Sequence, residues 1–474
     1  MKIGWVVIFV TVAACSKAPA PLPRVSMPSD IVAVISVPSL DGALPGLIDF
    51  VDKVKPGKGT ELRSEIDEEI GAEIADAIDR ARPMHLIIVA PPAGVADPGI
   101  VVVAAVRDAA KLAKMKSTER DVRLSGRWVA IGEPAVVDRT WRWALGTLAT
   151  GDPPASPSMS AFPAAIRDRW EGELRTQLDP GGSPAKTFAR DAVLGLLAQT
   201  ARVDAKVELA DGAATVDIAL TPRADTALAA VLAAQKPATF ALLERLPLES
   251  PLGVMAMHMS LGPFAAPVRG LITTLITSEL DEFGPRTAEL FETVWSIGTG
   301  EYAGVTIGGS AIVINAIGVS DPARVHAELQ SIAKAVTTIE IPGGRFVVEP
   351  LTHDGVAISV GKMVADATPG AIGGSWATWD NTLAFALSDL DGAVLRSTID
   401  GSRGKPAVPP VMAKVISDAR KRGDCFLQTV DVLPGEQPPL STAFGVRDGV
   451  GHLWMHIPGE QAGTMVKMVP SSDE

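Results

Sequence analysis

Short apolar runs alternate along the chain with longer segments of helical spacing, and together they predict an α+β protein. Ile31–Val37, Ile100–Val106 and Ala311–Val319 are continuous apolar runs of the length expected for buried strands. Other segments repeat their apolar positions every three to four residues, which is typical of amphipathic helices. The predicted helices include 61–81, 164–178 and 322–336, which would cover one face of a sheet.

The order of these segments repeats, which indicates an internal duplication. An apolar strand followed by a helix begins after Pro28, and a second such pair begins after Pro247. In each half a later strand ends at an aspartate, Asp108 or Asp321, and aspartate suits the N-cap of the helix that follows.

A pair of alternating strands around an Asp-Gly turn closes each half. The turns lie at Asp211-Gly212 and at Asp448-Gly449, and Asp-Gly favours a tight hairpin. We therefore predict two similar α+β domains, 28–240 and 241–474, each a mainly antiparallel sheet covered by helices. Chance similarity between two α+β halves is the alternative explanation. This layout resembles uncharacterised bacterial envelope proteins built from repeated strand-helix modules, and the resemblance implies no active site.

The N-terminus carries a targeting signal. After Lys2 comes an apolar run, Ile3–Ala14, whose last residues with the next one read Val12-Ala13-Ala14-Cys15. The run is shorter than the about 20 residues that span a bilayer. This pattern resembles the lipobox of bacterial membrane lipoproteins, which implies a signal peptide at 1–14 and a diacylglycerol on Cys15.

Residues 15–27 follow as a proline-rich tether, with prolines at 19, 21 and 23. Each proline fixes φ and removes an amide donor, so we expect an extended spacer. By resemblance to other lipoproteins, Ser16 after the lipid site favours the outer membrane, with the protein facing the periplasm. The lipid would be its membrane contact.

Composition narrows the classes of partner. The formal charge is -12, and no extended basic patch occurs, which argues against nucleic acid and against an acidic membrane face. The apolar fraction of 47% and the mean hydropathy of +0.24 indicate a well-filled core, because the most apolar internal stretch, 252–276, is broken by His258, two prolines and Arg269.

Metal and nucleotide sites find no support in the sequence. His452 and His456 lie on an alternating strand, where their Cα atoms would be roughly 13 Å apart. The glycines of 298–304 follow a predicted helix and precede a strand, the reverse of a phosphate-binding loop. Cys425 has no partner cysteine once Cys15 is lipidated, and it suits a buried core position. We predict no cofactor.

Catalytic motifs are equally weak. Ser331 and Lys334 match Ser-x-x-Lys, but the other elements of penicillin-recognising enzymes are missing, and Gly-x-Ser-x-Gly does not occur. Trp376 and Trp379, flanked by Asp380 and Asn381, are candidate ligand contacts, although core packing explains two tryptophans as well.

The sequence therefore favours a non-enzymatic, lipid-anchored cell-envelope protein that binds or scaffolds another envelope protein or a small ligand. One alternative is a periplasmic solute-binding lipoprotein that closes two lobes over a ligand. Another is a hydrolase whose catalytic residues are distant in sequence.

Overall fold

A computed structural model describes residues 22–92, 95, 97–178, 184–248, 251–262, 265–279, 284–308, 312–338, 344–365, 371–404, 408–431, 433 and 438–468. The predicted signal peptide and Cys15 lie outside these residues. The chain forms two compact units. Unit 1 comprises Met1–Gly42 and Asp67–Ala155, and unit 2 comprises Ala43–Ile66 and Ser156–Glu474.

Unit 1 contains five antiparallel strands in the order β1-β2-β3-β5-β4. Their inward side chains, together with α3 and α4, enclose a core that includes Ile78, Leu112 and Val129. The elements of this unit are β1 Ile31–Val37, β2 Met84–Val89, β3 Gly99–Ala105, β4 Asp121–Ser125, β5 Trp128–Gly132, α3 Ala72–Ala77, α4 Ala109–Lys114, α5 Pro134–Trp143 and the π-helix η1 Ala144–Leu148.

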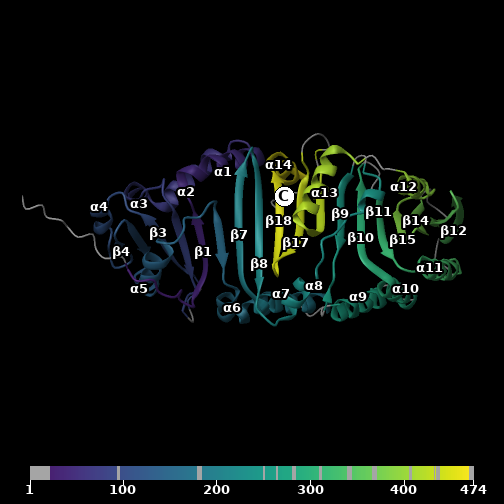
Figure 1. The fold of residues 1–474 in the computed structure, drawn as a ribbon, viewed down its shortest axis with the longest axis horizontal. Coiled ribbons are helices and arrows are strands. Elements are labelled where there is room, and N and C mark those ends of the chain that lie inside the picture. The colour runs from purple at the N-terminus through teal and green to yellow at the C-terminus, as the bar shows by residue number, and fades with distance from the viewer. Residues whose placement is uncertain are drawn as a thin grey trace, which may run out of the picture. The chain divides into compact units, whose positions relative to one another are not determined.

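The strands of unit 2 follow one another through antiparallel pairing in the order β6-β7-β8-β18-β17-β16-β9-β10-β11-β15-β14-β13-β12 (Figure 1). Their bounds are β6 Ser158–Ala161, β7 Thr200–Ala210, β8 Ala213–Pro222, β9 Pro251–His258, β10 Gly298–Ile307, β11 Ile312–Val319, β12 Gly344–His353, β13 Val356–Ala365, β14 Ala371–Trp379, β15 Thr382–Leu387, β16 Asp424–Val430, β17 Leu440–Arg447 and β18 Val450–Pro458.

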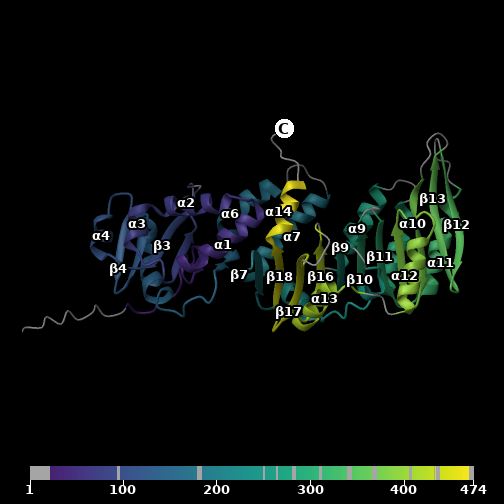
Figure 2. The ribbon, with the colours of Figure 1, turned by 90° about the horizontal axis from the view of Figure 1, so that it is seen from above.

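Helices α12 and α13 lie against one face of this unit-2 sheet (Figures 1 and 2). Ile399 of α12 and Ile416 of α13 share one core cluster with Ile314 and Leu427 of the strands. No helix in the described part of the chain is both long enough and apolar enough to cross a membrane. The remaining helices are α1 Leu40–Val54, α2 Lys58–Ile70, α6 Pro163–Leu178, α7 Pro184–Gln199, α8 Ala227–Ala234, the 3₁₀ turn η2 Leu243–Arg245, α9 Ala265–Glu279, α10 Gly284–Ile297, α11 Pro322–Val336, α12 Ala393–Arg403, α13 Pro410–Arg422 and α14 Gly459–Met468.

The predicted fold class, two similar domains with a sheet each, is wrong. Backbone pairing connects the eighteen strands of the described residues into one antiparallel sheet. Phe240 and Leu242, on either side of the expected boundary at 240/241, belong to the same core cluster. The physical reason is the ladder between β8 and β18, which satisfies backbone groups that two separate sheets would leave at free edges.

Within this sheet the strand order recurs. The order β1-β2-β3-β5-β4 of unit 1 has a counterpart in β9-β10-β11-β15-β14 of unit 2, where the hairpin β12–β13 is an addition. Asp108 caps α4 after β3, and Asp321 caps α11 after β11. Asp211 and Asp448 both start hairpin turns with φ near +50°, at 53° and 52°.

The β8–β18 ladder predicts a specific cross-link. Val216 pairs with Met455, so Val216→Cys with Met455→Cys places two cysteines directly opposite each other, at a Cα separation that a disulfide can span. We expect this pair to form the disulfide under oxidising conditions, as detected by mass spectrometry of tryptic peptides. The control pair Val216→Cys with Val450→Cys is displaced by roughly 17 Å along the strand and should stay reduced. Equal cross-linking of both pairs would contradict this ladder.

Candidate functional site

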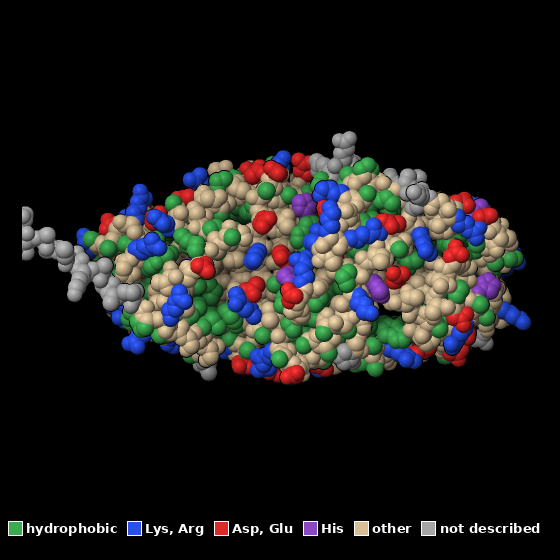
Figure 3. Space-filling view, in the orientation of Figure 1, with side chains coloured by type: hydrophobic (Ala, Val, Ile, Leu, Met, Phe, Trp, Pro, Cys, Tyr) green, Lys and Arg blue, Asp and Glu red, His purple; other side chains and the backbone are tan. Residues whose placement is uncertain are grey.

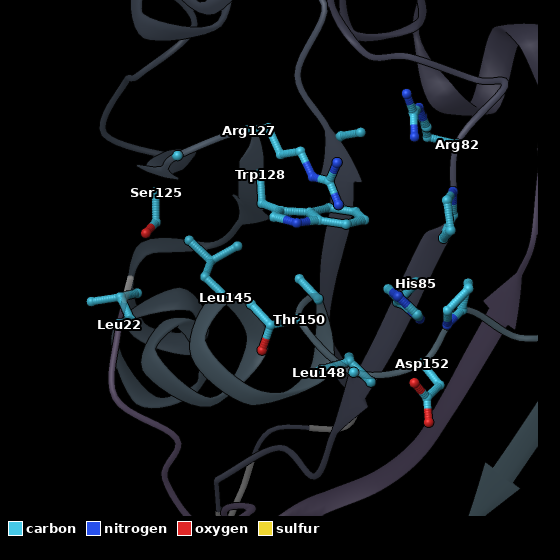
Figure 4. Close-up of a pocket in the computed structure, with 16 residues that line it drawn as sticks. Leu22, Arg82, His85, Ser125, Arg127, Trp128, Leu145, Leu148, Thr150 and Asp152 are labelled. Atoms are coloured by element: carbon cyan, nitrogen blue, oxygen red, sulfur yellow. The ribbon is translucent and has the colours of Figure 1, made fainter. Parts of the chain in front are cut away.

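A cavity of about 440 Å³ opens in unit 1 between the strands and η1 (Figure 4). Its size is within the usual range for small-molecule sites. β2, β3 and β5 supply one wall, and η1 with the segment after it supplies the other. It is lined by Leu22, Arg82, Pro83, His85, Ala105, Ser125, Gly126, Arg127, Trp128, Leu145, Leu148, Ala149, Thr150, Gly151, Asp152 and Pro153.

The chain that follows the proposed anchor packs closely against η1, which forms one wall of the cavity. α5 buries Val137 and Trp143, and η1 continues it with the buried Leu145. A Cβ on Gly146 would lie only 2.6 Å from the carbonyl oxygen of Pro23, so glycine is required at this position. π-Helical turns are frequent at functional sites, because the extra residue redirects side chains.

Thr147 completes this contact. Its hydroxyl lies 3.0 Å from both the amide nitrogen and the carbonyl oxygen of Val25, where it accepts from the first and donates to the second. The described end of the predicted tether, 15–27, thus contacts η1 of unit 1 through Pro23 and Val25. Leu22, the first described residue, lines the cavity itself.

Apolar surface and positive charge meet in the cavity. Trp128 is buried at the floor, and the guanidinium carbon of Arg127 lies 5.7 Å from the centroid of its ring (Figure 4). The Arg127 side chain has no hydrogen-bond partner in the described part of the chain. Arg82 is exposed and lies 3.7 Å from Asp79, a separation at which an ion pair contributes little. Because Asp152 is the one carboxylate of the lining, the cavity carries a net positive charge.

His85 adds a neutral polar group. Burial lowers the pKa of its imidazole from 6.5 to about 4, so the ring is uncharged at neutral pH. Its Nδ1 lies 2.8 Å from the hydroxyl oxygen of Ser36 on the neighbouring strand. The ring centroid of Trp128 is 6.5 Å away. His85 therefore supplies a fixed hydrogen-bonding group beside an apolar surface.

The Ser36–His85 pair has the separation of a nucleophile and its base, but not the other features of a hydrolase. A general base works best with a pKa near the operating pH, and the low pKa of His85 makes it a weak base. In the described residues no carboxylate accepts a hydrogen bond from this ring to orient it. Ser36 is also not among the residues that line the cavity. The arrangement suits binding better than acyl transfer.

The two tryptophans proposed as ligand contacts lie on opposite faces of β14. Trp379 is buried in the main core of unit 2, and its Nε1 donates to the hydroxyl of Ser402 at 3.0 Å. Trp376 is half-buried on the other face, close to Gly361. The structure does not bring the two side chains together, and neither lines the cavity of unit 1.

The other residues that the sequence analysis considered lie in the core, at a strand start or on a strand face. Cys425 is buried, and burial raises the pKa of its thiol to about 11. Gly298 starts β10 directly after α10, in the context that the sequence predicted. His452 and His456 share one face of β18 but bond different groups, Asp217 and Thr215.

Sequence reasoning missed the residues of the cavity. Arg127 and Trp128 follow a turn at Gly126. Its φ of 57° lies in the left-handed region, which favours glycine. That adjacency of a cation and an aromatic ring after a glycine turn was the available signal. Leu22 and His85 had none, because only the folded chain brings them to the same cavity.

The low pKa of His85 predicts how stability depends on pH. The unfolded histidine binds its proton near pH 6.5, whereas the folded one binds it only near pH 4. Stability should therefore fall as the pH drops from 6.5 to 4, by roughly 3 kcal/mol from this group. Chemical denaturation at several pH values should show a weaker decline for His85→Asn. Identical pH profiles for the two proteins would contradict the burial of a neutral imidazole.

Comparisons with known proteins do not identify the chain. It matches no protein-family model and no curated protein. Among solved structures it is similar to "Structure of crystal form III of TP0453", with 10% sequence identity and a TM-score of 0.25. That match covers 50% of this chain and 100% of the other chain. A likeness this low carries no functional argument.

Proposed function

We propose that this chain is a lipid-anchored cell-envelope protein that binds an alkyl carboxylate or a similar anionic amphiphile in the cavity of unit 1. The observation that carries the proposal is the lining of that cavity. Trp128, Leu145 and Leu148 offer apolar surface, while Arg82 and Arg127 offer positive charge. A ligand with an apolar body and one acidic group would match both parts.

The positive charge of Arg127 and the buried, neutral His85 favour an anionic ligand over a neutral one. The Arg127 guanidinium is held over Trp128 and has unused donors, and a guanidinium forms strong hydrogen bonds to a carboxylate or phosphate. The neutral His85 can add a hydrogen bond without adding charge. Binding would remove the apolar part of the ligand from water at about 25 cal/mol per Å² of buried surface.

The proposed anchor supports a ligand that comes from a membrane. Leu22 lines the cavity and is seven residues from Cys15, so the chain between them can span at most about 25 Å. A lipid on Cys15 would keep the cavity within that distance of a bilayer surface. Two or three acyl chains on the cysteine would give stable attachment.

Backbone pairing bears on the alternative of two lobes that close over a solute. If the lobes were the predicted domains, 28–240 and 241–474, β8 and β18 would pair across their boundary, from Ala213–Leu220 to Gly451–Pro458. A hinge between those halves would break this ladder. Binding within a single unit therefore fits the structure better than closure of two lobes.

The cavity lining predicts a selective effect of Arg127→Gln. We expect this variant to bind decanoate, kept below its micellar concentration, about fivefold more weakly in calorimetric titration, because a charge-assisted hydrogen bond is lost. Affinity for neutral decanol should change less than twofold. Arg142→Gln is the matched control, because Arg142 also stacks on a tryptophan, at 5.5 Å from Trp141, but does not line the cavity.

Equal weakening by Arg127→Gln and Arg142→Gln would contradict the proposed site. No saturable binding of either probe to the parent protein would reject the proposed ligand class. Circular dichroism and thermal unfolding should show that both variants keep the fold, since both side chains lie at the surface.

The anchor predicts a separate result for Cys15→Ser. This variant should no longer incorporate labelled lipid or partition into the detergent phase, because serine cannot carry the thioether-linked diacylglycerol. Far-ultraviolet circular dichroism of the body should be unchanged. Detergent-phase partitioning equal to that of the parent would show that the attachment to the membrane does not depend on this cysteine.

A further inference from the structure

A second cavity, of about 370 Å³, lies in unit 2 on the sheet face opposite α12 and α13. Val254 and Val305 share the core cluster of those helices, and side chains along a strand alternate between its two faces. Met255 and Gly304 therefore lie on the opposite face. Figure 3 shows the molecule from the side of α13, where charged side chains of both signs lie at the surface. In the described part of the chain, by contrast, no charged residue and no histidine lines this cavity.

Backbone pairing places the lining side chains in two rows across β16, β9, β10 and β11. The first row is Gln428, Met255, Gly304 and Asn315. The second row is Val430, Gly253, Thr306 and Val313. A glycine occupies an inner position of each row, so the sheet surface is hollowed there between larger side chains. Gln428 and Asn315 are three strand spacings apart, which is roughly 14 Å.

Asn315 is the buried polar group of the cavity. Only 8% of its surface is exposed, and its neighbours Ile314 and Ala316 belong to the core on the other face of the sheet. Its Oδ1 accepts a hydrogen bond from the hydroxyl of Tyr302. Within the described residues its Nδ2 has no hydrogen-bond partner, although Asn315 lines the cavity. Because buried polar groups nearly always have a partner, this amide marks a place for an acceptor atom of a ligand.

Tyr302 orients that amide. A Cβ on Gly304 would lie 2.8 Å from the hydroxyl oxygen of Tyr302, so the glycine leaves room for the phenol to reach Asn315. Burial raises the pKa of Tyr302, which keeps its hydroxyl protonated and able to donate. The carboxamide of Asn315 is thereby fixed with its NH₂ group free. At the other end of the first row, Gln428 is exposed and offers a second carboxamide.

We propose that this cavity binds a short apolar peptide through its uncharged peptide groups. A peptide group offers a carbonyl acceptor and an N–H donor, which match the side-chain amides of Asn315 and Gln428. The separation of these two residues corresponds to about four residues of extended chain. An apolar side chain of the peptide would pack between Met255 and Val313. This proposal is independent of the ligand and of the anchor proposed above, because it depends on unit 2 alone.

The hydrogen bond between Tyr302 and Asn315 also fits a purely internal role, in which it links β10 to β11 and water fills the hollow. The apolar part of the lining favours a ligand over that interpretation. Leu252 is 41% exposed at this cavity, and Met255 and Val313 are half-buried beside it. Water satisfies the amide of Asn315 but leaves this apolar surface exposed, whereas a peptide satisfies the amide and covers the surface.

The first test fills the cavity with a larger side chain. Val313 lines the cavity, and its pairing partner on β15, Leu387, lies on the same face but outside the lining. Leu387 is 53% exposed, so Leu387→Trp is the matched control for Val313→Trp. We expect Val313→Trp to weaken peptide binding about tenfold or more, because the indole occupies the hollow. Leu387→Trp should change the affinity less than about twofold.

The second test introduces no bulky residue. Gln428 is exposed, and Thr442 pairs with it on β17 without lining the cavity. Gln428→Ala should weaken peptide binding about threefold, because one hydrogen bond is lost, whereas Thr442→Ala should have little effect. If Val313→Trp unfolds, as thermal denaturation would show, this second pair of variants still decides the question.

The probe is acetyl-Ala-Leu-Ala-amide, titrated calorimetrically into the full chain, and its analogue is acetyl-Ala-Leu-Ala with a free carboxylate. At the site that Val313→Trp closes, we expect the parent to bind the amide about fivefold more tightly than the carboxylate. The physical reason is that no charged side chain of the described residues lines the cavity to compensate the desolvation of a carboxylate.

Three results would overturn the proposal. These are no saturable binding of the amide up to about 10 mM, an equal effect of the two tryptophan variants, and binding of the carboxylate at this site as tight as that of the amide. Displacement of the peptide by an equal concentration of hexanol would also overturn it, because the cavity would then recognise an alkyl chain and not a peptide group.

Discussion

The antiparallel ladder between β8 and β18 is the interaction on which the rest of unit 2 depends. Each of these strands is the outer strand of a hairpin that turns at Asp-Gly, and each would otherwise present a row of unpaired amides and carbonyls. Pairing them satisfies both edges at once. Asp217 and Trp454 face each other near the middle of the ladder.

The same ladder positions the side chains of β18. Thr215 on β8 orients His456, and Asp217 lies 3.2 Å from Nδ1 of His452. The arrangement of these side chains thus depends on contacts between segments more than two hundred residues apart in sequence. α13 covers this part of the sheet because Met412 and Ile416 are buried in the core, and Arg422 near its end lies over the Trp454 ring. A change that separates β8 from β18 would therefore disturb both the fold and this local packing.

The cavity of unit 1 places positive charge beside apolar surface in a chain whose formal charge is -12. Net charge governs long-range attraction, but a bound ligand responds to the groups within a few ångströms, since screening at physiological salt acts over about 8 Å. Arg127 over Trp128 and Arg422 over Trp454 are two versions of one local device. Arg127 keeps its donors free, whereas Arg422 donates to the buried Asp424. The histidine near each arginine is neutral because burial lowers its pKa. The cavity of unit 1 therefore suits recognition of an anion better than proton transfer.

The sequence by itself determined the local structure. Alternation and apolar runs predicted β1, β8, β11 and β18, and the Asp-Gly pairs predicted hairpin turns because those residues tolerate positive φ. Asp108 and Asp321 were identified as helix caps because a short acidic side chain accepts from the first turn. The sequence analysis did not predict β14, so it did not separate Trp376 from Trp379, which lie on opposite faces of that strand. Only the tertiary structure decided which edges pair and which residues line a cavity. Backbone groups in any strand can pair with those of any other, and the partner is chosen by packing across the whole chain. Only after that choice is made do Leu22 and His85 line one cavity and does Arg422 lie over Trp454.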